Sequence, residues 1–199
     1  MSWNTTIAVV EGAQPAELER AGLQPREGSV LADFALGGRP DDVGHPGAVF
    51  AGSVPGGTVV LGDLMDVLEL APTLAPALGR TVRLAVFGGT SDSYLWQVIT
   101  PEGPVRELRS QSGETDADDG QPDPAEAASG LGVLSEDTLI ALLERTTGVT
   151  FDDALLETPT TPYVRFGPDT APSGPSAAPG LTASAPRRRS LLDRILGRG

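Results

Sequence analysis

The feature that most constrains this chain is a change in composition at Gly167. From Gly167 to Pro186 nearly every residue is Pro, Ala, Gly, Ser or Thr. Such a segment has too few large apolar side chains to offset the entropy of ordering it. We therefore expect a disordered, flexible linker over 167–186 and a single folded domain over residues 1–166, a length that suits one hydrophobic core.

The residues after this linker differ in charge from everything before them. Residues 187–199 contain five arginines and one aspartate, whereas residues 1–186 contain nine arginines and 26 acidic residues. Four large aliphatic residues recur in the terminal segment at helical spacing, so they share one face, and Ser190 suits the N-cap. Two turns are too short to be stable alone, so the spacing predicts a basic amphipathic helix that orders on binding.

We interpret this terminal helix as a docking segment for a larger protein partner or multi-subunit assembly. Burial of its aliphatic side chains would contribute about 6–10 kcal/mol before ordering costs, which corresponds to micromolar binding. The predicted docking residues are Arg187, Arg188, Arg189, Leu191, Leu192, Arg194, Ile195 and Leu196.

Two alternatives for the terminal segment remain open. It binds an anionic membrane, which is the weaker alternative because two turns bury little area in lipid. Otherwise it folds back onto the acidic body of its own chain.

Residue types that are absent or rare exclude several classes of function. The chain has no cysteine, no lysine and one histidine, and its formal net charge is −13. Zinc fingers, iron–sulfur clusters and disulfide frameworks need cysteine, whereas Schiff-base chemistry and the Walker A loop need lysine. Strong acidity argues against nucleic acid as a partner. We therefore expect no cofactor, no metal site and no catalytic residue, as in a non-enzymatic accessory protein.

Two groups of polar residues keep a carboxylate-based enzyme or ligand-binding domain open as an alternative. His45 lies beside two aspartates in a turn-rich segment, although no nucleophile or further metal ligand accompanies it. Asp63, Asp66 and Glu69 repeat every three residues and would share a helix face, as paired catalytic carboxylates do. Such a face is more often simply the solvated side. The run Asp116–Gly120 lacks the ligand spacing of a calcium loop.

Runs of β-branched and apolar residues between Gly and Pro turns predict an α+β fold, mostly an antiparallel sheet packed with short helices. We expect strands at residues 5–10, 48–51, 58–61, 81–87, 94–99 and 105–109, and a final edge strand at 163–166. Caps and apolar spacing predict helices at 15–21, 30–36 (with a strand as the alternative), 64–70, 73–78, 136–147 and 153–157.

One proline and one acidic stretch set boundaries in this prediction. Pro72 should end the helix that Asp63 caps, because proline supplies no N–H to the helical ladder. Between Gly113 and Glu126 there are six acidic residues and no basic one. We therefore expect residues 111–130 to form an acidic mobile loop.

The opening Trp3–Gly12, the turn Pro101–Arg106 and the segment Gly120–Glu126 before a helix that ends at Gly148 resemble small actinobacterial α+β domains. These are immunity-protein-like and accessory domains of unknown function, and the resemblance covers roughly residues 3–157. It implies a small cytoplasmic domain and brings no functional residues. The first residues lack the basic and apolar regions of a secretory signal, which also favours the cytoplasm.

Overall fold

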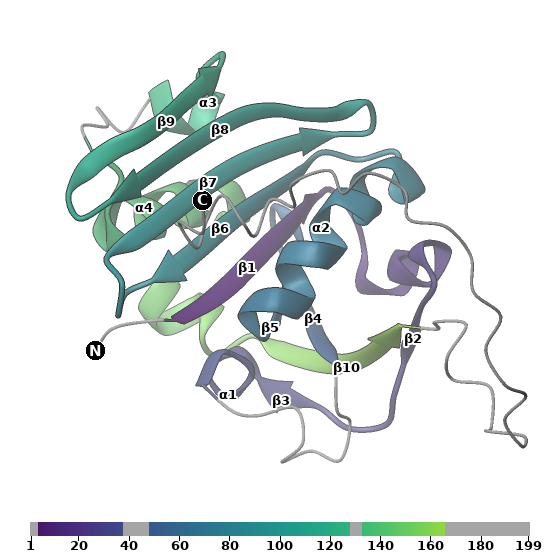
Figure 1. The fold of residues 1–199 in the computed structure, drawn as a ribbon. Coiled ribbons are helices and arrows are strands. Elements are labelled where there is room, and N and C mark those ends of the chain that lie inside the picture. Colours follow the sequence, from purple (N-terminus) through teal and green to yellow (C-terminus); the bar gives the residue numbers. More distant parts are fainter. Residues whose placement is uncertain (1–3, 38–47, 128–132, 166–199) are drawn as a thin grey trace, which may run out of the picture. The chain divides into compact units, whose positions relative to one another are not determined.

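The computed structural model describes residues 4–37, 48–127 and 133–165 (Figure 1), and every structural statement below refers to these ranges. The predicted linker over 167–186 and the predicted terminal helix over 187–199 lie outside them.

A single antiparallel sheet organises the described part of the chain. Its strands are β1 (Asn4–Glu11), β2 (Leu23–Pro25), β3 (Val30–Leu31), β4 (Val49–Val54), β5 (Gly57–Gly62), β6 (Val82–Gly88), β7 (Ser93–Thr100), β8 (Gly103–Gln111), β9 (Glu114–Gly120) and β10 (Pro159–Arg165). Their order is β2-β10-β4-β5-β1-β6-β7-β8-β9, and β3 pairs with β10. Strand β1 is central and buried on both faces, which explains its continuous run of β-branched and apolar residues.

Helical segments lie on both faces of this sheet. They are the 3₁₀ helix η1 (Pro15–Ala21), α1 (Ala32–Gly37), α2 (Leu64–Leu78), α3 (Pro124–Ala127), α4 (Glu136–Thr147) and the π-type turn η3 (Phe151–Leu155). Helix α2 lies against β1, β5 and β6 in front of the sheet, and α4 lies behind it against β6 and β7 (Figure 1). A mostly antiparallel sheet with short helices confirms the expected class. No helix in the described ranges is long and apolar enough to cross a membrane.

Helix α4 forms as its end signals predict. The Ser135 side chain accepts a hydrogen bond from the Thr138 N–H, and Gly148 ends the helix in the left-handed conformation. Its buried stripe packs on alternate strand residues in a core that includes Ile7, Val9, Phe87, Trp96, Val98, Leu139, Leu142, Leu143 and Phe151. In the last turn Thr147 is also buried.

Helix α2 differs from the prediction, because it continues through both Pro72 and Pro76 to Leu78. The two prolines are four residues apart and exposed, so both lie on the solvent side of the helix. Each proline removes one N–H from the helical ladder, but its ring lies on the exposed side and not in the buried stripe. The opposite stripe is buried against the sheet: Val67, Leu68, Leu70, Ala71, Leu74, Ala75 and Leu78. Tertiary packing therefore outweighs the local break.

Residues 111–127 do not form the loop that we expected over 111–130, and residues 128–130 lie outside the described ranges. Strand β9 pairs with β8 along most of its length, and α3 follows it. Strands β8 and β9 pair although the acidic stretch has few apolar residues, because arginines of β8 and β6 neutralise acidic side chains in it. A pattern of acids alone carries no information about those distant arginines.

Strand β10 is an interior strand and not the predicted edge strand. Its residues pair with β4 on one side and with β2 on the other. The outer place is taken by β2, a three-residue strand that the apolar pattern did not reveal. Similarly, residues 30–36 divide between β3 and α1 instead of forming one helix.

Candidate ligand pocket beside helix α2

The predicted docking residues cannot be located on the fold, because Arg187–Leu196 lie outside the described residues. The same holds for His45 and its two neighbouring aspartates. The third group of candidates, the carboxylates of α2, is described, and two of its members line a cavity.

Most buried charges of the domain belong to structural ion pairs. Arg106 on β8 binds Glu126 of α3 through two nitrogens, with Nε–Oε1 at 2.9 Å and Nη2–Oε2 at 2.7 Å, and it also binds the Asp118 carboxylate. These partners raise the pKa of Arg106 above its already high ordinary value. Arg83 on β6 binds Asp123 and Glu11, each at 3.1 Å.

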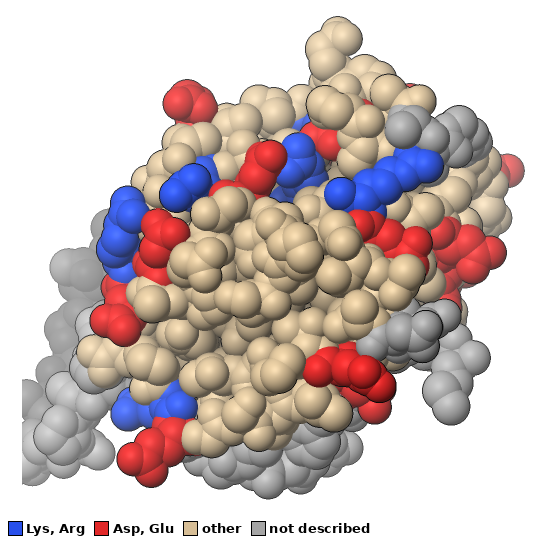
Figure 2. All heavy atoms as spheres, turned by 180° about the vertical axis from the view of Figure 1, so that it is seen from behind, with Lys and Arg blue, Asp and Glu red and all other residues tan. Residues whose placement is uncertain are grey.

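These pairs attach α3 and β9 to the sheet and leave the charges satisfied. The space-filling view from behind agrees with this, since most basic groups lie next to acidic ones (Figure 2). The pairs therefore explain how the acidic stretch folds, and they are not available for chemistry.

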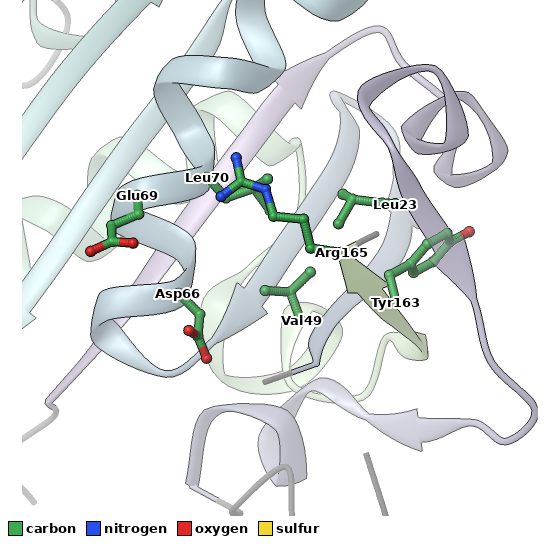
Figure 3. Close-up of a pocket in the computed structure, with 7 residues that line it drawn as sticks. All are labelled: Leu23, Val49, Asp66, Glu69, Leu70, Tyr163 and Arg165. Carbon is green, nitrogen blue, oxygen red and sulfur yellow. The ribbon is translucent and has the colours of Figure 1, made fainter. Parts of the chain in front are cut away.

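A cavity of about 100 Å³ lies where α2 crosses the β2-β10-β4 end of the sheet. Seven residues line it (Figure 3): Leu23, Val49, Asp66, Glu69, Leu70, Tyr163 and Arg165. Leu23, Val49, Leu70 and Tyr163 are at most 4% exposed, so they form an apolar floor. The charged residues at the cavity are less buried: Glu69 and Arg165 are exposed, and Asp66 is half-buried.

The charged groups at this cavity differ from the ion-paired arginines of β6 and β8. Asp66 and Glu69 lie one turn apart on α2, and Arg165 approaches from β10 (Figure 3). Within the described ranges none of these three side chains forms an ion pair. Arg165 instead donates a hydrogen bond from Nη2 to Thr73 Oγ1 at 3.1 Å.

Two titratable groups of the cavity have shifted pKa values. Burial raises the pKa of Asp66, and the negative charges of Asp63 and Glu69 raise it further. Burial also raises the pKa of Tyr163, with a smaller contribution from Glu19, so its hydroxyl stays protonated at neutral pH. The cavity thus has two acidic side chains and one arginine that forms no ion pair with a described residue.

The sequence prediction of a shared acidic helix face is correct for Asp66 and Glu69. Asp63 has a different role, because its carboxylate accepts the N–H of Met65 at 3.1 Å and caps the helix. Sequence reasoning missed Tyr163 and Arg165. Only strand pairing brings β10 to this place from almost a hundred residues away, and no local pattern marks it.

The chemistry of these residues suits the binding of a small charged molecule. Among the described residues no group of three or more His, Cys, Asp or Glu side chains is placed to hold a metal ion. Carboxylates, a guanidinium and a phenol around an apolar floor can orient a small charged molecule. No family model, curated protein or solved structure matches this chain.

Proposed function

We propose that this protein is a non-enzymatic accessory protein whose C-terminal segment docks the folded domain onto a larger protein partner or assembly. The observation that carries the proposal is the reversal of charge at Arg187, from a net −17 over residues 1–186 to +4 over residues 187–199. Four aliphatic residues at helical spacing within that basic segment add an apolar face that a protein groove would bury.

The composition of residues 167–186 supports the same proposal. As a flexible coil, these 20 residues would give the segment 187–199 an r.m.s. reach of about 25 Å. Cytoplasmic location is part of the same proposal.

Affinity purification of the full chain and of a chain that lacks 187–199 tests the docking proposal. We expect a partner that the truncated chain does not retain and that a synthetic 187–199 peptide displaces. Leu192→Asp should act like the deletion, since a carboxylate on the apolar face cannot be buried. Arg188→Ala is the matched control and should weaken binding mildly and mainly at low salt, because exposed charges are screened.

Identical partners for the full and truncated chains would overturn the proposal. Flotation with anionic vesicles decides the membrane alternative. Flotation that depends on 187–199, without a protein partner, would replace the docking role with membrane tethering.

A second function, ligand binding by the domain itself, is favoured by one specific observation. The cavity beside α2 combines an apolar floor with two carboxylates and an arginine that are not paired with one another. A carboxylate-based enzyme would use the same residues.

A further inference from the structure

We propose that the cavity beside α2 binds a small zwitterion with a short aliphatic chain. In this arrangement an ammonium group faces Asp66 and Glu69, a carboxylate faces Arg165, and the chain lies on Leu23, Val49 and Leu70. This inference rests on the second function, ligand binding, and is independent of docking through the C-terminal segment.

The floor of the cavity limits the size of the ligand. The cavity has a volume of about 100 Å³. Three or four methylene or methyl groups fit such a space, and the charged ends of the molecule remain at the mouth.

The charged residues at the mouth of the cavity indicate a ligand that carries both a positive and a negative charge. In the described domain Arg83, Arg106 and Arg109 all bind carboxylates of their own chain. Arg165 lies at the same cavity as Asp66 and Glu69, yet no ion pair within 4.0 Å joins them. Opposite charges held apart by a cavity are complementary to a molecule that carries both charges at a similar separation.

The local electrostatics agree with an ammonium group on the α2 side. The pKa of Asp66 is raised by burial and by its acidic neighbours, and no ion pair with a described residue compensates its charged form. A cation there would relieve that repulsion.

Arg165 is oriented for the other end of the molecule. Its Nη2 donates to Thr73 Oγ1, which holds the guanidinium beside α2 while most of its five N–H donors stay unused by the described chain. A guanidinium in this state binds a carboxylate through two parallel hydrogen bonds.

Titration calorimetry of the full chain with a probe series tests the proposal. The probes are β-alanine, 4-aminobutyrate, 6-aminohexanoate and leucine, with butylamine and butyrate as single-charge controls. We expect at least one zwitterion to bind at least tenfold more tightly than either control, because only it satisfies both ends. Equal binding of butylamine, or no binding of any zwitterion at 10 mM, would overturn the proposal.

Substitutions in the same full chain test which residues bind the ammonium end of the ligand and which bind its carboxylate end. Asp66→Asn, Glu69→Gln and Arg165→Gln should each weaken zwitterion binding about tenfold, a loss of about 1.4 kcal/mol. Glu102→Gln and Arg145→Gln remove exposed charges elsewhere and should leave it unchanged. An Arg165→Gln variant that binds normally would contradict the assignment.

A measurement on the unsubstituted chain keeps the test valid if a variant misfolds. Methyl NMR shifts of Leu23, Val49 and Leu70 should move on addition of the zwitterion, and those of Leu139 on the other side of the sheet should not. Deletion of 187–199 should leave these shifts intact. Loss of docking with normal zwitterion binding would overturn only the proposed docking function, and the reverse result would overturn only the cavity proposal.

Discussion

Arg106 shows how a single residue decides whether an acidic segment folds. Its side chain is 4% exposed, and that of its partner Glu126 is 5% exposed, so both charges are removed from water. Such a pair is stable only when each charge is fully compensated. Glu126 also accepts the backbone N–H of Asp123 at 3.1 Å, which begins helix α3. One arginine thus organises the end of β9 and the helix after it.

Replacement of this arginine should be costly. We expect Arg106→Met to lower the free energy of unfolding by about 3–5 kcal/mol, because it leaves the buried Glu126 carboxylate without its cation. Urea denaturation at pH 7 measures the change. The matched control is Arg20→Met, since the Arg20 side chain is 59% exposed and its pair with Glu17 contributes about 0–1 kcal/mol.

The double variant Arg106→Met/Glu126→Met should be more stable than Arg106→Met alone, because it also removes the uncompensated carboxylate. Equal costs for Arg106→Met and Arg20→Met would show that the buried pair does not hold β9 and α3 in place.

Asp66 should make stability depend on pH in a defined direction. Its pKa is raised in the folded chain, so the folded state binds its proton more tightly than the unfolded state. Stability therefore falls as pH rises from the ordinary carboxyl pKa of about 3.9 through the raised value. Asp66→Asn should be more stable than the parent chain at pH 7 and equally stable at pH 3.5.

Urea midpoints at the two pH values measure this difference. Glu102→Gln, which removes an exposed charge in the turn between β7 and β8, is the control for net charge. A variant Asp66→Asn that is less stable than the parent chain at pH 7 would mean that the carboxylate stabilises the fold.

At the scale of elements, helix ends were predictable and helix continuity was not. The caps Ser135 and Gly148 of α4 act through residues within four positions, so local sequence carries the signal. Continuation of α2 through Pro72 depends on the sheet beneath it, which packs against Leu70 and Leu74 on the other side of the helix. That surface is assembled from strands far apart in the sequence.

The prolines of α2 should reduce stability in a measurable way. We expect Pro72→Ala and Pro76→Ala each to raise the free energy of unfolding by about 1–2 kcal/mol. The gain of a helical N–H is worth up to about 3 kcal/mol, and the greater freedom of the unfolded chain offsets about 1 kcal/mol of it. Thermal or urea unfolding measures the gain.

Pro15→Ala is the matched control for these substitutions. Pro15 is the first residue of η1, where no helical N–H is needed, so its replacement should change little. A loss of stability in Pro72→Ala would indicate that the proline shapes the packing of α2 on the sheet.

For the whole molecule, the decisive feature is the order of the strands. Strands β6 to β9 are neighbours in sequence and in the sheet, and their meander follows from the turns between them. By contrast, β1 lies between β5 and β6, and β10 enters between β2 and β4. These long-range pairings create the cavity beside α2, because they bring Arg165 and Tyr163 to the acids of the helix.

The amino-acid sequence by itself determined the fold class, the strands of the meander, the caps of α4 and the shared face of Asp66 and Glu69. It also determined the charge reversal at Arg187 on which the docking proposal depends. These features follow from composition and from periods of two to four residues. The tertiary structure alone decided that β9 is a strand, that α2 continues through its prolines and that β10 is interior. Each of these outcomes depends on a buried surface or a compensating charge supplied by residues distant in the chain, which no local pattern encodes.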